Sequence, residues 1–158
     1  MDDKKFMEMA LKQAKIAFTK GEVPVGAIVV HQGKVISRAH NGTEEHQDAT
    51  LHAELMAIRR ASAYLKQWRL TGATLYTTLE PCVMCAGALL LSRVDRLVYG
   101  AKDFRHGGDG SLISLMRENH PIHTIEIASG VCKEESAQLL RTFFKERRDE
   151  KRDGGTSR

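Results

Sequence analysis

The sequence predicts one α/β domain over residues 1–148, a three-layer α/β/α sandwich in which helices cover both faces of a mixed five-stranded sheet. Three observations lead to this prediction. Helical and strand-like patterns alternate along the chain, and the first two strand-like segments form a hairpin. The length of 158 residues suits one domain with a real core, but it is too short for two comfortable ones. Residues 149–158 are expected to form a frayed or disordered tail.

Apolar periodicity and turn residues define the expected elements. Phe6, Ala10, Ala14 and Phe18 recur at the four-residue spacing of a helix face, and Gly21 ends that helix. The remaining assignments follow from the same reasoning. In chain order we expect a helix at 3–20, strands at 28–30 and from 35, a polar loop through 48, a helix at 51–65, a strand at 73–79, a helix at 82–92, a strand at 94–100, a polar loop at 101–110, a short helix at 111–116, a strand at 123–127 and a helix at 131–148.

Composition narrows the class of protein. Hydrophobic residues make up 42% and charged residues 28%, which is ordinary for a globular domain. The longest apolar run lies near Ala88–Leu91, so we expect no membrane span. The N-terminus leads into an amphipathic pattern and not into a signal region, which favours a cytoplasmic location. The net charge of +4 is compatible with an RNA partner, although many proteins without one are as basic.

Two short motifs carry the chemistry. The first, His52-Ala53-Glu54, offers an imidazole and a carboxylate, and the second, Pro81-Cys82-Val83-Met84-Cys85, offers two thiols at i and i+3 on one helix face. One nitrogen and two sulfurs suit Zn²⁺, and three protein ligands leave a fourth position for water, as in catalytic sites. Such a water is acidified towards neutrality. Glu54 then serves as a proton carrier and not as a fourth ligand.

Purely structural interpretations remain open for several of these residues. A histidine at a helix start is often only a cap, and two buried cysteines can be structural. Asn41 precedes Gly42 and is either a turn residue or an amide that holds a planar heterocycle. Gly26 lies in a stretch of small side chains, where it permits either close approach of a ligand or, as we favour, tight packing of a helix. Cys132 is interpreted as structural. No role is assigned to His31, His40, His46, His106, His120 or His123.

Together the motifs resemble the zinc nucleobase deaminases of the cytidine/deoxycytidylate deaminase superfamily. The resemblance covers residues 6–148 and narrows to the bacterial tRNA-specific adenosine deaminases of the TadA type. It rests on the zinc motifs, on the Phe143-Phe144 pair and on three further blocks: Gly21-Glu22-Val23-Pro24-Val25-Gly26-Ala27, Thr78-Leu79-Glu80-Pro81-Cys82-Val83-Met84-Cys85-Ala86-Gly87-Ala88 and Val98-Tyr99-Gly100-Ala101-Lys102-Asp103.

The resemblance implies a cytidine deaminase-like fold and a hydrolase of C–N bonds in cyclic amidines. Its reaction would turn adenosine into inosine at the wobble position of the tRNA anticodon, with one Zn²⁺ per subunit of a homodimer. His52, Cys82 and Cys85 would bind zinc, and Glu54 would shuttle protons for a zinc-bound water that attacks C6. The N–H of Ala53 would bond to the zinc-bound oxygen. The implied substrate contacts are Asn41, with Val25 and Leu79 lining the pocket, and Lys102, Asp103 and Phe144 at neighbouring nucleotides.

The chain departs from the family pattern at Ala49, where proline is common, and at Leu51, where alanine is common. Neither change removes a chemical group, but both affect the loop before His52. Two other functions remain as alternatives. One is a zinc deaminase of a free base or nucleoside, such as cytosine or guanine. The other is an RNA-binding module with a structural zinc, which Glu54 argues against because a structural site needs no such carboxylate.

Overall fold

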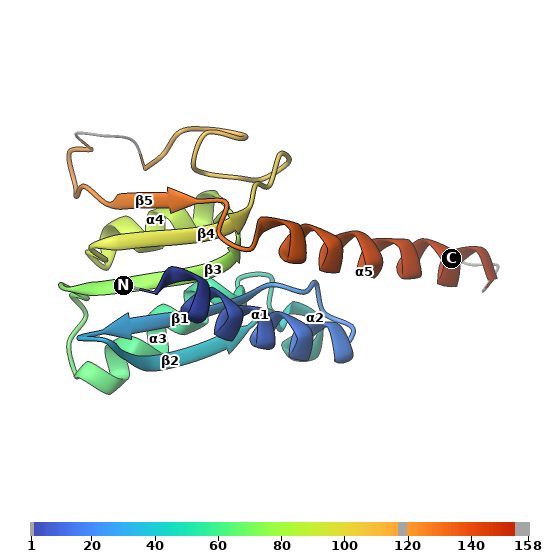
Figure 1. Cartoon of the computed structure of the whole chain (residues 1–158), viewed down its shortest axis with the longest axis horizontal. Coiled ribbons are helices and arrows are strands. Elements are labelled where there is room, and N and C mark those ends of the chain that lie inside the picture. The colour runs from blue at the N-terminus through green and yellow to red at the C-terminus, as the bar shows by residue number, and fades with distance from the viewer. Residues whose placement is uncertain (1, 117–119, 154–158) are drawn as a thin grey trace.

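The protein is built on a five-stranded mixed sheet with the strand order β2-β1-β3-β4-β5 (Figure 1). The computed structural model describes residues 2–116 and 120–153. Strand β1 pairs antiparallel with β2 and β3, whereas β3, β4 and β5 run parallel. The elements are α1 (Asp3–Thr19), β1 (Gly26–His31), β2 (Lys34–His40), α2 (Thr43–His46), α3 (Ala53–Leu65), β3 (Ala73–Leu79), α4 (Val83–Leu91), β4 (Arg96–Ala101), β5 (Glu126–Ser129) and α5 (Lys133–Asp153).

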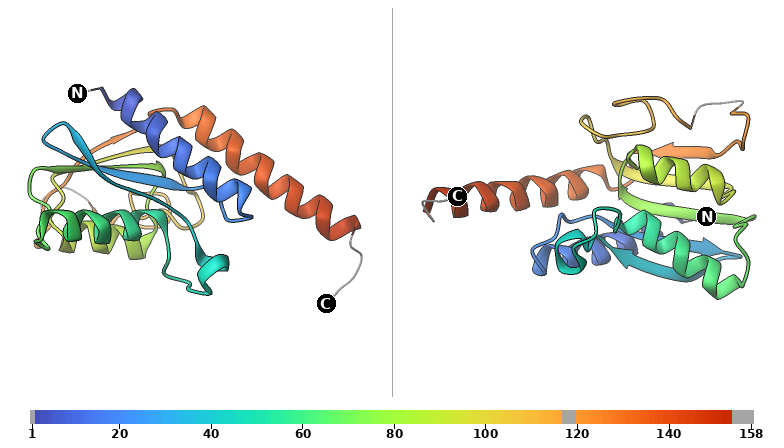
Figure 2. Two further views of the ribbon diagram at one scale, coloured as in Figure 1. Left: turned by 90° about the horizontal axis from the view of Figure 1, so that it is seen from below. Right: turned by 180° about the vertical axis from the view of Figure 1, so that it is seen from behind.

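Helices lie on both faces of the sheet, so the predicted α/β/α sandwich with a mixed five-stranded sheet is confirmed. Helices α1 and α5 lie on one face, and α3 and α4 lie on the other (Figure 2). Side chains of β1 alternate between two cores, as the pleat of a strand requires. Ile28 and Val30 pack with Phe6 and Met7 of α1, whereas Val29 belongs to the core beneath α3 and α4.

Gly26 permits helix α1 to lie directly against the sheet. A Cβ atom at this position would lie 2.1 Å from the carbonyl oxygen of Ala10 and 2.4 Å from the backbone nitrogen of Ala14. Both contacts are with backbone atoms, which cannot rotate away. The interpretation of Gly26 as a helix-packing position is therefore confirmed.

Several boundaries differ from the sequence prediction. The predicted short helix at 111–116 is wrong, because these residues form turns and a bridge between Asp109 and Ser114. Strand β5 starts at Glu126, three residues later than expected, and α2 was not predicted. Residues 149–153 of the expected frayed tail are helical, because α5 extends to Asp153, and residues 154–158 lie outside the described residues. Among the described residues, no helix is long and apolar enough to cross a membrane.

Candidate metal centre and active site

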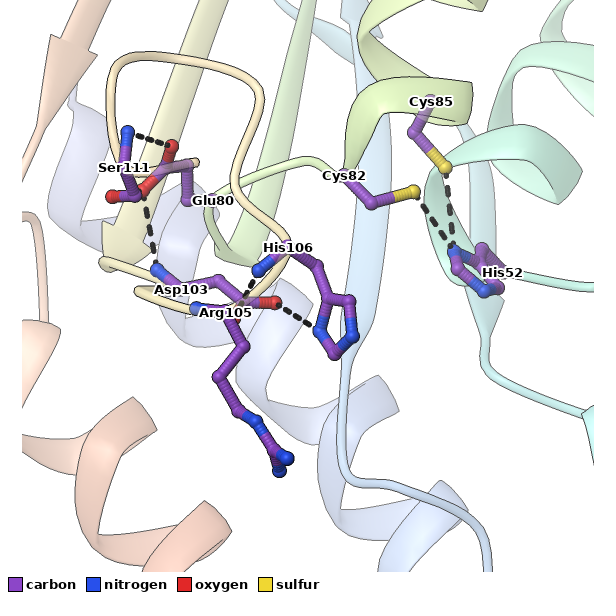
Figure 3. Close-up of polar contacts among 8 residues, drawn as sticks. All are labelled: His52, Glu80, Cys82, Cys85, Asp103, Arg105, His106 and Ser111. Atoms are coloured by element: carbon purple, nitrogen blue, oxygen red, sulfur yellow. Dashed lines mark hydrogen bonds and ion pairs between the residues drawn. The ribbon is translucent and has the colours of Figure 1, made fainter. Parts of the chain in front are cut away.

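Two helix N-termini meet on the α3–α4 side of the sheet. His52 is the N-cap of α3 and Cys82 is the N-cap of α4, and both have extended backbone conformations. Neither side chain makes a capping hydrogen bond to its own helix. Both side chains are therefore able to turn towards each other, while Cys85 approaches from the first turn of α4 (Figure 3). The sequence prediction placed His52 and Cys82 inside their helices, because it began the first helix two residues early, at 51, and the second helix one residue early, at 82.

The three predicted metal ligands come together. His52 Nδ1 lies 3.5 Å from Cys82 Sγ and 3.6 Å from Cys85 Sγ, and the three ligand atoms all lie within 4.8 Å of one another. Ligand atoms around a tetrahedral zinc are about 3.5 Å apart, given bonds of about 2.0–2.3 Å. Both the donor set and its spacing therefore fit Zn²⁺.

Mutual contact shifts the pKa values of the three side chains in this cluster. Contact with Cys85, and then with His52, lowers the pKa of Cys82 to about 4. Contact with Cys82, reinforced by burial, raises the pKa of Cys85, and contact with the Cys82 thiolate raises the pKa of His52. These shifts arise because the two thiols and the imidazole lie in direct contact. A bound cation favours deprotonation of both thiols.

Glu54 lies in the first turn of α3 and is 4% exposed. Burial raises the pKa of its carboxyl group to about 7. Its carboxylate is not among the ligand atoms that lie within 4.8 Å of one another. A carboxyl group that titrates near neutrality beside a metal centre can both accept and donate protons.

Three of the predicted substrate residues, Val25, Asn41 and Ala53, are joined by hydrogen bonds. The backbone N–H of Asn41 donates to the carbonyl of Val25 at 3.1 Å, and Asn41 Oδ1 accepts from the N–H of Ala53 at 2.8 Å. The latter bond engages the amide oxygen, so a further contact of Asn41 as a donor would come from its amide nitrogen. A contact from the Ala53 N–H to substrate would require this bond to be shared. Leu79 ends β3 and packs against the core beneath α3 and α4.

The other predicted contacts lie farther along the chain. Lys102 is exposed, and Asp103 shapes its own loop, because its Oδ1 accepts from the N–H groups of Arg105 and His106 at 3.1 Å each. Phe144 lies instead on α5, where its ring packs edge-to-face on Phe143 with centroids 5.3 Å apart.

Sequence reasoning missed two buried carboxylates beside the site. Glu22 accepts from the N–H groups of Glu44 and Glu45 at 3.0 and 2.7 Å, and it thereby holds α2 in the loop before His52. Glu80 holds the loop after β4. The sequence did contain an indication of Glu80, because this glutamate lies inside an apolar block, next to the Pro81 that opens the cysteine motif.

Comparisons with known proteins agree with this geometry. The MafB19-like deaminase family matches residues 1–148. The tRNA-specific adenosine deaminase of Bacillus subtilis is 49% identical over 150 residues, which cover 95% of this chain and 93% of that protein. A solved structure from a study of A-to-I editing by tRNA:A34 deaminases at the wobble position of transfer RNA superimposes with a TM-score of 0.83. It is 45% identical, and the match covers 86% of this chain and 99% of that one.

A more distant structure shares the fold. The guanine deaminase of Nitrosomonas europaea superimposes with a TM-score of 0.76 at 24% identity, covering 89% of this chain and 83% of that one.

Proposed function

This chain belongs to the tRNA-specific adenosine deaminase family, within the MafB19-like deaminases, and we propose that it converts adenosine to inosine at the wobble position of the tRNA anticodon. The observation that carries this function is the convergence of His52, Cys82 and Cys85 beside the buried Glu54, in a chain that matches its relatives over nearly their full length. The reaction consumes one water and releases ammonia.

One Zn²⁺ per subunit is the proposed cofactor, held by His52, Cys82 and Cys85. When bound, the ion supplies Lewis-acid activation of water at the coordination position that the protein leaves open. Two observations support the assignment: the donor set of one imidazole and two thiols, and their mutual spacing.

Glu54 is the proposed proton carrier. Its carboxylate takes a proton from the attacking water and delivers it to the ring nitrogen next to C6. It then helps to protonate the amino group that leaves as ammonia. The burial that raises its pKa to about 7 supports both roles, since a group poised near neutrality accepts and releases protons with little cost.

The substrate base must leave the anticodon stack to reach this site. Asn41 would donate from its amide nitrogen to the adenine ring, because its oxygen is held by Ala53. Val25 and Leu79 would line the base pocket, and the Ala53 N–H would share its bond with the reacting group. Lys102, Asp103 and Phe144 would contact neighbouring nucleotides. These assignments agree with single-stranded RNA recognition, which relies on splayed bases, stacking and polar contacts.

A homodimer in the cytoplasm is also proposed. Helix α4 leaves apolar side chains in solvent, with Val83 39% and Leu91 60% exposed, and a Cβ atom added at Gly87 would meet nothing within 4 Å. An uncovered apolar helix face of this kind suits contact with a second copy. The cytoplasmic assignment follows from the tRNA substrate.

Product analysis tests the proposal. Zinc-loaded protein is incubated with an anticodon stem–loop RNA that contains a wobble adenosine, and free adenosine, adenine, cytosine and guanine are run in parallel. Inosine from the stem–loop alone is the expected result. Turnover of a free base with an inert stem–loop would move the protein to the small-molecule deaminases, and RNA binding without any turnover would favour a binding module.

A further inference from the structure

Glu80 is a buried carboxylate that the proposed chemistry does not use. It follows β3 directly and precedes Pro81 and the metal ligand Cys82. The residue is only 1% exposed. Burial of a carboxylate is costly unless hydrogen bonds replace its water shell, so its partners indicate its purpose.

Among the described residues, the hydrogen-bond donors to this carboxylate all lie in one loop, residues 103–111. Figure 3 shows the contacts with Asp103 and Ser111. Oε1 accepts from the N–H of Asp103 at 3.1 Å and from Ser111 Oγ at 2.5 Å. Oε2 accepts from the N–H groups of Asp109 and Ser111 at 2.9 and 3.4 Å. The Glu80 side chain is therefore hydrogen-bonded to both the first and the last residues of the loop.

The loop sequence is adapted to this carboxylate. A Cβ atom at Gly107 would lie 2.2 Å from Glu80 Oε2 and 2.6 Å from the carbonyl oxygen of Asp103. The neighbouring Gly108 N–H donates to the carbonyl of Pro81 at 2.7 Å, and Gly107 forms a bridge with Cys82. The inner turn of the loop thus lies against the segment that carries the metal ligand.

The outer turn of the same loop faces solvent. Phe104 is 78% exposed, and Arg105 and His106 are exposed beside it. Proteins that bind single-stranded RNA use aromatic rings to stack on bases and cationic or polar groups to contact phosphates. The outer turn presents both kinds of group next to the proposed base-binding site. The outer turn is held by Asp103, whose Oδ1 accepts from the N–H groups of Arg105 and His106. Asp103 is in turn held by Glu80, which accepts from its backbone N–H.

We propose that Glu80 is a positioning residue for the RNA substrate: its carboxylate fixes the 103–111 loop so that Phe104, Arg105 and His106 meet the nucleotides that flank the target adenosine. This inference rests on the proposed function. Glu80 touches neither the target base nor the metal. It acts through the loop, so its loss weakens RNA binding and spares the chemical step.

The test is Glu80→Gln in the full-length, zinc-loaded protein. Glutamine keeps the shape but places an NH₂ donor where N–H and O–H donors already point, so the loop must open. We expect KM for the anticodon stem–loop to rise about tenfold while kcat stays within about threefold, which is the signature of lost uniform binding. Zinc content and melting temperature serve as structural readouts. Glu134→Gln, the same change at an exposed position of α5, should match wild type.

Binding is measured separately from turnover. In a Glu54→Ala background, the Kd of a fluorescent stem–loop should rise by the same factor when Glu80→Gln is added. Gly107→Ala disrupts the same contact from the loop side. If these variants fold poorly, Ser111→Ala is used instead, because it removes only one hydroxyl donor to Glu80. Because Glu80 and Gly107 share one contact, the double variant should bind RNA little worse than either single variant.

Unchanged KM and Kd in Glu80→Gln and Gly107→Ala would overturn the inference. So would a fall in zinc content and kcat at constant KM, which would make Glu80 a support of the metal site. Failure of the proposed function gives a different result, namely a wild-type protein that makes no inosine from the stem–loop.

Discussion

Removal of Asp3 should destabilise the protein, because this residue fastens the start of α1 to the centre of the sheet. Asp3 Oδ1 accepts from Arg96 Nη1 at 2.7 Å and from Tyr76 Oη at 2.8 Å, and Asp3 Oδ2 accepts from Arg96 Nη2 at 2.8 Å. The guanidinium thus grips the carboxylate with two parallel bonds, which is the strongest geometry for such a pair. The substitution is Asp3→Ala.

The magnitude follows from the partial burial of this pair. The side chains of Arg96 and Asp3 are 19% and 24% exposed. Exposed ion pairs contribute about 0–1 kcal/mol, whereas buried hydrogen bonds to charged groups contribute about 1.5–3 kcal/mol. An intermediate value of about 1 kcal/mol for the bidentate pair and about 1 kcal/mol for the Tyr76 hydroxyl gives a loss of about 2 kcal/mol. For a domain of this size, that loss lowers Tm by about 4–8 °C.

The effect should depend on pH with a definite sign. The hydrogen bond from Arg96 holds the pKa of Asp3 below its ordinary value. A depressed folded-state pKa contributes stability that is fully present above the unfolded-state pKa of about 3.9, and that is lost as pH falls through the folded-state pKa. The difference between wild type and Asp3→Ala should therefore be constant near neutrality and shrink below about pH 4.

Urea denaturation followed by far-ultraviolet circular dichroism, at pH 7 and in steps towards pH 3, measures the free energy of unfolding. Asp149→Ala, which removes an exposed carboxylate from α5, is the matched control and should change stability by less than about 0.5 kcal/mol. A loss below about 0.5 kcal/mol for Asp3→Ala, or a difference that stays the same through the acid range, would refute the reasoning.

Three further predictions concern the site and its scaffold. Glu54→Gln should lower inosine formation by about 10²–10⁴-fold while zinc, measured by mass spectrometry, stays bound; wild-type turnover in this variant would contradict its role as proton carrier. Dialysis against a chelator should abolish turnover and Zn²⁺ should restore it, and Co²⁺ reconstitution should give the visible absorption of a tetrahedral thiolate site; full activity of metal-free protein would argue against the cofactor. Gly26→Ala should lower Tm strongly, because the new Cβ meets the α1 backbone, whereas a Tm equal to that of wild type would show that α1 can move aside.

The residues of the His52, Cys82 and Cys85 cluster could be predicted from sequence because each depends on local spacing. Cys82 and Cys85 lie three residues apart at a helix start, and His52 and Glu54 flank one residue at another. Donor type and spacing are properties of short segments, and they limit the chemistry before any fold is known. Only the fold brings the two segments together, since thirty residues separate His52 from Cys82.

The errors in the prediction occur where distant backbone groups compete with local preference. Residues 111–116 have an apolar pattern that favours a helix, but the N–H groups of Leu112 and Leu115 donate to Gly107 and Gly108. The N–H of Ser111 turns to Glu80. These bonds hold the segment in turns, and the bond of Leu115 uses a donor that a helix beginning at 111 would need. In the opposite direction, α5 continues to Asp153 through a charged segment in which no apolar period indicates a helix.

By itself, the sequence determined the α/β class, the order of the main elements, the zinc-type donor set and the glutamate beside it. Periodicity and motif spacing report on neighbours within a few residues of each other. Only the tertiary structure shows that the amide oxygen of Asn41 accepts a hydrogen bond from Ala53. It alone shows that Glu80 binds a loop that starts twenty-three residues away. Hydrogen bonds of this kind join groups whose proximity is created by folding, so no pattern within one segment can reveal them.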